Sequence, residues 1–330
     1  MNRKPIIIVT GEPNSVFLEL FFKVYKKRIK NKLKTPVLLI TSKNHLLMQM
    51  KYFKYSFKIN VVNNYKKLNI DNNKINIIDV KYNFKKVFEK ISSKSNLYIK
   101  KSFKIALKII KKNLGRALIN GPISKKYFLK NKHLGITEYL AKKTKSKSVM
   151  LIYNKKFSVS PITTHLPVRN IAVNLNKGII INNAKEIYKF YVKYKNKKPN
   201  IAVLGLNPHC ETINRFSEED KIIKPAIKQL IKNKIKIEGP FSADTFFSRQ
   251  NTNKFDVVIG MYHDQVLTPI KTILNFDAIN VTLGLPFLRV SPDHGPNEKM
   301  LGKNKSNSRS FLNCIDFIEK FKWKLNPKKV

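Results

Sequence analysis

Short apolar runs alternate with amphipathic helical segments along much of this 330-residue chain, and this alternation limits the possible folds most strongly. Residues 5–10, 36–41 and 75–80 are compact apolar runs that predict buried strands. Residues 16–24 and 95–113 repeat apolar side chains at helical spacing. Strand–helix alternation of this kind is typical of α/β layers with a largely parallel sheet. The length is enough for two domains that share a cleft.

The middle of the chain departs from this alternation. Residues 148–153 and 157–164 flank Asn154-Lys155-Lys156, a pattern that predicts a hairpin. The run Ser217-Glu218-Glu219-Asp220 reads as a capping box that opens a helix running to about Asn233.

Three histidines each follow a strand-like apolar run: His165, His209 and His263. Ligands gather at the carboxyl ends of strands in open parallel sheets, so side chains distant in sequence can meet there. Three neutral imidazoles with an open fourth position make a catalytic site for a divalent metal, with Zn²⁺ favoured. The alternative is that each is an ordinary surface or core histidine, since no short H-x-x-H pair is present.

Composition narrows the class of protein. The net charge of +46 alone suggests nucleic acid as a partner, but the lysines are scattered along the whole chain. We therefore favour a solvated lysine surface, with no nucleic acid and no membrane partner, and expect the charge to help attract anionic substrates. Two cysteines give no disulfide framework, and no apolar run is long enough for a signal sequence or a membrane span. A cytoplasmic protein is expected.

Several polar residues interrupt otherwise apolar stretches. Lys271 and Arg289 are candidate anion binders, because Arg offers a planar fork and Lys a point charge. Asn280 lies inside a strand-like run, where it either faces a site or lies on an exposed edge. Asp244 is a general base, a residue that orients a metal ligand, or a helix cap.

Six sequence blocks stand out: TTHLP at 163–167, GLNPH at 205–209, GP at 239–240 with ADT at 243–245, GMYHDQ at 260–265, VTLGLPF at 281–287 through Arg289, and DHG at 293–295. Together, in family order and over about residues 5 to 302, they resemble the 4-hydroxythreonine-4-phosphate dehydrogenase family of vitamin B6 biosynthesis. The resemblance implies a homodimer with a two-domain α/β/α architecture like that of isocitrate and isopropylmalate dehydrogenases. It also implies an active site in the interdomain cleft at the dimer interface.

The resemblance implies roles for particular residues and regions. Residues 1–120 with 266–330 would form a cofactor-side domain, and 121–265 a domain for metal, substrate and dimerisation. The implied metal ligands are His165, His209 and His263. The implied substrate-binding residues are Thr137, Lys271, Asn280 and Arg289, with Ile136 at a further family substrate position. Candidate catalytic bases are Asp244 and Asp264, and candidate cofactor contacts are Asp293, His294 and Gly295.

This chain departs from the family pattern at three places. Ile136 replaces a histidine of the family's Gly-His-Thr-Glu, so one polar substrate contact is missing. The turn after Gly11-Glu12-Pro13 lacks the family's glycines, and Pro296-Asn297 replace Thr-Ala after the DHG block. The last change touches the segment that resembles the NAD loop of related dehydrogenases, and no G-x-G-x-x-G is present, so NAD and NADP both stay open.

The resemblance implies a metal-requiring, NAD- or NADP-dependent oxidoreductase of pyridoxine biosynthesis, using Zn, Mg or Co. Its substrate would be 4-phosphooxy-L-threonine, a small phosphorylated amino acid. Oxidation would give 2-amino-3-oxo-4-phosphooxybutyrate, and decarboxylation would give 3-amino-2-oxopropyl phosphate. The alternatives are a dehydrogenase of threonate or erythronate 4-phosphate, which Ile136 favours, and a basic nucleic-acid-binding protein.

Overall fold

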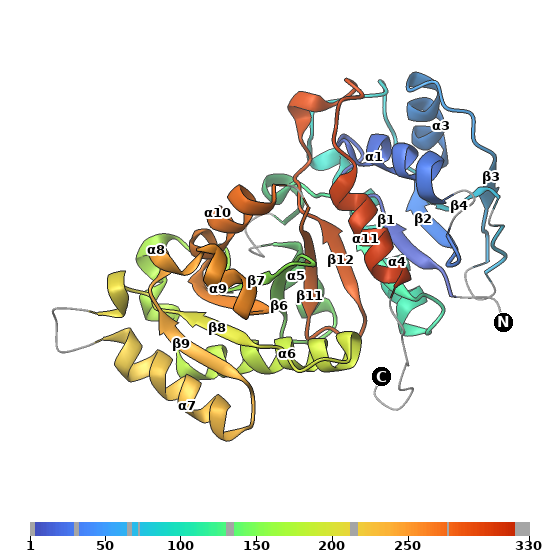
Figure 1. The fold of residues 1–330 in the computed structure, drawn as a ribbon. Coiled ribbons are helices and arrows are strands. Elements are labelled where there is room, and N and C mark those ends of the chain that lie inside the picture. The colour runs from blue at the N-terminus through green and yellow to red at the C-terminus, as the bar shows by residue number, and fades with distance from the viewer. Residues whose placement is uncertain are drawn as a thin grey trace. The chain divides into compact units, whose positions relative to one another are not determined.

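The computed structural model describes residues 4–29, 33–64, 68–71, 73–129, 135–211, 217–275 and 277–320 (Figure 1). These residues form two compact units. Unit 1 runs to Thr144 and resumes at Pro286, and unit 2 is Lys145–Leu285. The units change at 144 and 285, whereas the sequence predicts functional domains that change at 120 and 265. The assignment of cofactor and metal binding to those domains stays a prediction.

Unit 1 contains a parallel sheet, as the strand–helix alternation predicts. Its strands follow the order β3-β4-β2-β1-β5-β12, and each pair of neighbours is parallel. The strands are β1 (Ile6–Val9), β2 (Val37–Thr41), β3 (Ile59–Val61), β4 (Ile75–Asp79), β5 (Ala117–Asn120) and β12 (Arg289–Pro292). The predicted strands at 5–10, 36–41 and 75–80 are therefore confirmed.

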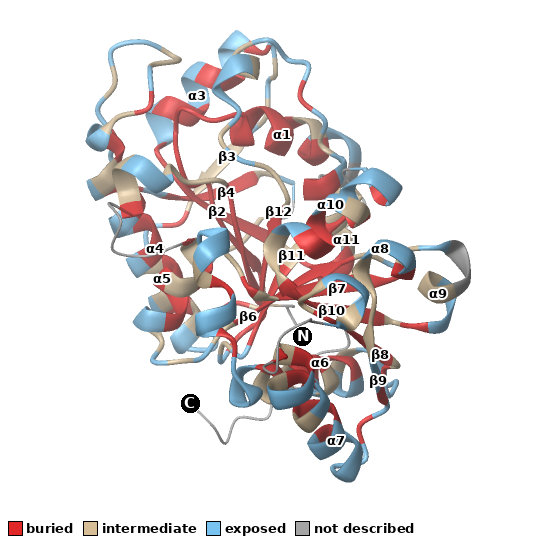
Figure 2. Ribbon diagram, turned by 90° about the vertical axis from the view of Figure 1, so that its left-hand side faces the viewer, coloured by how far each residue is buried: buried red, intermediate tan, exposed pale blue. Residues whose placement is uncertain are grey.

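Helices flank this sheet. They are α1 (Phe17–Val24), α3 (Lys43–Tyr52), α4 (Asn96–Lys111), α5 (Ile136–Lys143) and α11 (Arg309–Glu319). Helix α4 packs on β1, β2 and β5 through the predicted apolar stripe, of which Ile99, Phe103 and Ala106 are fully buried. Its five lysines all lie at exposed positions, which agrees with a solvated lysine surface. Figure 2 shows the same division, with red strands and blue outer helix faces.

Unit 2 has a mixed sheet in the order β11-β6-β7-β10-β8-β9. The strands are β6 (Val149–Tyr153), β7 (Ser158–Thr163), β8 (Ile201–Leu204), β9 (Ile237–Phe241), β10 (Val257–Tyr262) and β11 (Ile279–Leu283). Strands β7, β10, β8 and β9 are parallel. The predicted hairpin is confirmed, because β6 pairs antiparallel with β7, and β6 is also antiparallel to β11.

The helices of unit 2 cover both faces of its sheet (Figure 1). They are α6 (Lys177–Lys195), α7 (Lys224–Lys232), α8 (Ala243–Phe246), α9 (Arg249–Lys254) and α10 (His263–Leu274). Val159 packs in the apolar cluster with Val266 and Ile270 of α10. The next residue, Ser160, hydrogen-bonds Asn183 of α6 at 3.2 Å. Successive side chains of a strand point to opposite faces, so α6 and α10 lie on opposite sides.

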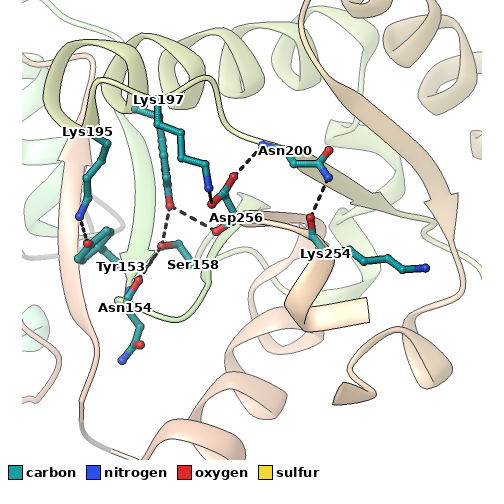
Figure 3. A network of polar contacts seen from close by, with 9 residues as sticks. Tyr153, Asn154, Ser158, Lys195, Lys197, Asn200, Lys254 and Asp256 are labelled. Carbon is teal, nitrogen blue, oxygen red and sulfur yellow. Dashed lines mark hydrogen bonds and ion pairs between the residues drawn. The ribbon is translucent and has the colours of Figure 1, made fainter. Parts of the chain in front are cut away.

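A cluster of polar side chains lies at the amino-terminal ends of three strands of this sheet (Figure 3). The Asp256 carboxylate accepts hydrogen bonds from the backbone N–H of Asn200 at 2.9 Å and from Lys197 Nζ at 2.6 Å. Tyr191 Oη contacts Ser158 Oγ at 3.1 Å and donates to the Asp256 carbonyl at 3.3 Å. The cluster therefore ties the starts of β7, β8 and β10 together.

Among the described residues, no helix has the length and apolar character that crossing a membrane requires.

Candidate functional site

The three predicted metal ligands follow three neighbouring parallel strands of unit 2. Strand β10 pairs with β7 on one side and with β8 on the other. His263 directly follows β10, His165 lies two residues after β7, and His209 lies in a short turn after β8. The sequence expectation that these segments end at one edge of a sheet is met by this topology.

Two of these imidazoles lie side by side. The ring centroids of His165 and His263 are 5.7 Å apart, with an angle of 37° between the rings. Asp264 Oδ1 lies 2.7 Å from Nδ1 of His263. A carboxylate on one ring nitrogen orients the imidazole and directs its other nitrogen toward a ligand. Asp264, predicted as a base, is therefore positioned to orient His263.

His209 adopts a backbone conformation that is uncommon for residues other than glycine, with φ of 55° and ψ of 11°. The next residue, Cys210, also has a positive φ, of 61°.

Asp244, near the start of α8, accepts hydrogen bonds from Ser242 Oγ at 2.7 Å and from the Thr245 N–H at 2.9 Å. The Ser242 hydroxyl, the Thr245 N–H and the nearby His209 hold the pKa of this exposed carboxyl below its usual range.

The histidines and nearby acidic residues form no complete metal-binding set among the described residues. Within the described part of the chain, no group of three His, Cys, Asp or Glu side chains is arranged to hold a metal ion. Imidazoles are suitable donors for Zn²⁺, and the contact between His165 and His263 supplies two of them. His165 and His263 thus form an adjacent pair, and His209 lies after the end of the neighbouring strand β8.

Unit 1 brings together two of the predicted substrate residues. Arg289 on β12 is fully buried, and its Nε donates to Asn120 Oδ1 at 2.8 Å. Its Nη1 donates to Thr137 Oγ1 at 3.4 Å. Burial lowers the pKa of Arg289 to about 10, with Cys314 and Glu138 acting in the opposite direction, so the guanidinium stays charged at neutral pH. A buried cation held by neutral oxygen atoms is a suitable partner for an anionic ligand.

The remaining predicted substrate residues lie on separate elements. Ile136 is the first residue of α5 and is half-buried. Lys271 is exposed on α10, and Asn280 is a half-buried residue of β11. The Asn280 Oδ1 atom is buried and accepts no hydrogen bond from the residues that the structure describes.

The segment Asp293–Gly295, predicted to contact the cofactor, follows β12. The Asp293 N–H donates to Ser310 Oγ at 2.9 Å. His294 Nδ1 lies 2.9 Å from the Gly295 carbonyl oxygen, whereas its Nε2 is buried with no hydrogen-bond partner among the described residues. Burial lowers the pKa of His294. Apart from its chain neighbours, no described residue has an atom within 4 Å of the point where a Cβ on Gly295 would stand, so the backbone there is open to a ligand.

Sequence reasoning assigned no role to three polar residues at these sites. Asn120 holds the Arg289 guanidinium, Gln265 links two strand ends, and Glu219 holds the turn before His209. Gln265 lies in the GMYHDQ block, and Asn120 directly follows the apolar run 117–119, which was the available signal. Glu219 carried no such signal, because its acidic run is also typical of a helix start.

Comparisons with known proteins agree with this architecture. The family model described as pyridoxal phosphate biosynthetic protein PdxA matches residues 32–318. The chain is 37% identical to the 4-hydroxythreonine-4-phosphate dehydrogenase of Sulfurihydrogenibium sp. (strain YO3AOP1) over 247 residues, which cover 73% of this chain and 75% of that protein. It is 34% identical to a protein of Oceanobacillus iheyensis that is provisionally named D-threonate 4-phosphate dehydrogenase, over 64% of this chain and 65% of that protein.

A solved structure supports the fold. The 1.25 Å crystal structure of 4-hydroxythreonine-4-phosphate dehydrogenase from Klebsiella pneumoniae matches with a TM-score of 0.82 and 24% sequence identity, over 96% of this chain and 98% of that chain. The α/β fold class inferred from the sequence is thereby confirmed, and the family model and the Sulfurihydrogenibium relative confirm the family resemblance. The chain belongs to the family of the pyridoxal phosphate biosynthetic protein PdxA.

Proposed function

We propose that this chain oxidises 4-phosphooxy-L-threonine with NAD or NADP in pyridoxal 5'-phosphate biosynthesis. The product, 2-amino-3-oxo-4-phosphooxybutyrate, loses CO₂ to give 3-amino-2-oxopropyl phosphate. The observation that carries the proposal is the location of three histidines just after three neighbouring parallel strands, in a chain whose residues 32–318 match the PdxA family. The name of the Sulfurihydrogenibium relative supports the same reaction.

The proposal includes two bound groups. His165, His209 and His263 would hold a divalent metal ion (Zn, Mg or Co), and the adjacent rings of His165 and His263 support this set. Asp293, His294 and Gly295 would contact the nicotinamide cofactor, which the open backbone at Gly295 and the buried Nε2 of His294 support. When bound, a metal ion lowers the pKa of a hydroxyl group and a nicotinamide accepts hydride.

The chain's own residues bind the substrate and take up its proton. Lys271 and Arg289 would hold the substrate's phosphate and carboxylate, with Thr137 and Asn280 as further contacts. The substrate's secondary hydroxyl gives its proton to Asp244 or Asp264, directly or through water, as hydride leaves the same carbon. The resulting β-keto acid loses CO₂ because the electron pair of the broken bond is delocalised into the ketone.

Nicotinamide reduction by purified protein tests this function. The assay supplies 4-phosphooxy-L-threonine with NAD or NADP, with and without a chelator. We expect reduction that the chelator abolishes and added Zn, Mg or Co restores. His209→Ala should remove the metal-dependent rate while leaving the fold intact, since a catalytic metal contributes less to folding than a structural one. Full turnover by a sample shown to be metal-free would contradict the metal assignment.

The general base is tested by two matched variants. Asp244→Asn and Asp264→Asn each remove one carboxylate with little change in volume. If one of these two carboxylates is the general base, its Asn variant should lower kcat by at least about a hundredfold, a common contribution of a general base. Equal, small effects in both variants would show that neither carboxylate takes the proton.

A second substrate class is favoured by one residue. Ile136 offers no polar atom at a position where the family usually has histidine, and the Oceanobacillus relative is provisionally named D-threonate 4-phosphate dehydrogenase. Threonate or erythronate 4-phosphate is therefore the alternative substrate. A comparison of kcat/KM for the amino and hydroxy substrates decides between them.

The resemblance also supports a homodimer. Sedimentation at several protein concentrations tests this assembly, and a monomer at all concentrations that still turns over substrate would contradict it.

A further inference from the structure

Two of the strands that lead to the candidate metal ligands, β8 and β10, separate before β10 ends. Main-chain pairing between β10 and β8 stops at Ile259 and Val203. On its other side, β10 stays paired with β7 as far as Tyr262 and Thr163. The end of β8, which leads to His209, therefore leaves β10 several residues before His263. Such a separation at the carboxyl ends of parallel strands provides room for a ligand, but it removes the bonds that would fix the strand ends.

The side chain of Gln265 bridges this gap. Its Oε1 accepts a hydrogen bond from the Met261 N–H of β10 at 2.7 Å. Its Nε2 donates to the Gly205 carbonyl, just after β8, at 2.7 Å. The side chain is buried, so water does not compete for these bonds. Gly260 has no side chain, and a Cβ at this position would lie 2.9 Å from Gln265 Oε1. The glycine therefore leaves room for the Gln265 amide beside the strand.

The bridge continues on both sides. Thr163 Oγ1 at the end of β7 donates to the Met261 carbonyl at 2.8 Å, which links the strand before His165. Beyond Gly205, the buried Glu219 carboxylate accepts the N–H groups of Leu206 and Asn207 at 2.7 and 2.9 Å. The turn that leads to His209 is thereby held to the same framework.

We propose that Gln265 is a positioning residue that fixes the strand ends of His165, His209 and His263 relative to one another. Gln265 lies in the first turn of α10, two residues after His263, and acts on β8 through the Gly205 carbonyl. This inference rests on the proposed function, because the three imidazoles need a common geometry only if they share a ligand. Residues that hold metal ligands in place typically change metal affinity by about 10–100-fold when they are replaced.

The test is Gln265→Met, which keeps the side-chain length and removes both hydrogen bonds. Gln229→Met is the matched control, because Gln229 is exposed on α7 of the same unit. Gln265→Glu is the intermediate variant, since it keeps an acceptor for the Met261 N–H and loses the donor to Gly205. Co²⁺ affinity by titration, kcat, KM and the thermal transition are measured for each, well below the transition temperature. His209→Ala serves as the reference for metal loss.

We expect Gln265→Met to bind Co²⁺ at least about tenfold more weakly and to lose kcat by a similar factor, with Gln265→Glu between it and wild type. Gln229→Met should match wild type. A lower transition temperature with unchanged Co²⁺ affinity and kcat would refute the positioning role, as would a failure of both Gln265 variants to fold. If wild type and His209→Ala bind Co²⁺ equally, the metal assignment of the proposed function is wrong. In that case kcat of Gln265→Met against Gln229→Met decides the positioning role.

Discussion

Replacement of Arg289 by lysine tests whether its buried cation serves the substrate or only the fold. The guanidinium donates through Nε to Asn120 and through Nη1 to Thr137, and the side chain is fully buried. Lysine keeps the charge but lacks the planar fork, so it cannot hold both oxygen atoms and an anion in the same geometry. Each hydrogen bond to a charged group contributes about 1.5–3 kcal/mol.

Two readouts separate the two roles. The loss of one of these bonds, together with poorer burial of an ammonium group, should lower the free energy of unfolding by about 2–3 kcal/mol, measured by urea denaturation. A substrate role adds a second effect, a fall in kcat/KM of at least about tenfold, which corresponds to roughly 1.4 kcal/mol of transition-state binding. Initial rates of nicotinamide reduction, taken where the variant is fully folded, give this value.

The control is Arg309→Lys, since Arg309 is an exposed arginine at the start of α11 in the same unit. It should leave both measurements unchanged. If Arg289→Lys lowers the free energy of unfolding while kcat/KM equals that of wild type, Arg289 does not bind the substrate. Its role is then limited to stabilising the fold.

Three further outcomes are expected. Burial lowers the pKa of His45 to about 4 from 6.5, so the unfolded chain binds more protons between these values. Stability should therefore fall as pH drops from 6.5 toward 4, by up to about 3 kcal/mol, and urea unfolding of His45→Gln should show a flatter dependence. Asp256→Ala removes the acceptor of the Asn200 N–H and should cost about 2 kcal/mol in thermal or urea unfolding, while Lys197→Ala, which loses an ion pair whose lysine is largely exposed, should cost less than about 1 kcal/mol; equal costs would contradict this account. Ile136→His should lower KM for 4-phosphooxy-L-threonine, whereas a loss of turnover together with better wild-type activity on threonate 4-phosphate would favour the alternative substrate.

Local patterns were enough for most elements. Strands with compact apolar runs and helices with a repeated stripe lie where the sequence predicts them, because burial of an apolar face dominates their energetics. The predicted helix after Ser217 is also present and ends with α7 at Lys232. Its capping box is only half formed, since Ser217 Oγ accepts the Asp220 N–H at 3.4 Å while the Asp220 carboxylate pairs with Lys224. The carboxylate of Glu219, one residue earlier, instead accepts a hydrogen bond from the N–H of Asn207, in the segment before His209.

Long-range contacts required the tertiary structure. Arg289 and Asn120 are 169 residues apart, and they meet because β12 and β5 are parallel neighbours with Arg289 opposite Leu118. Nothing local in either segment specifies that register. The same holds for Gln265 and Gly205, which are 60 residues apart.

The α/β class, the family and the location of three histidines after strands could be inferred from the residues alone, since each depends on local periodicity or on motifs that are read directly. The folded arrangement was needed to learn which strands are neighbours, where β10 and β8 separate and which side chains bridge the gap. A buried polar side chain finds its partner according to the register and spacing of the strands around it. Those are set by the packing of whole layers and by no single segment.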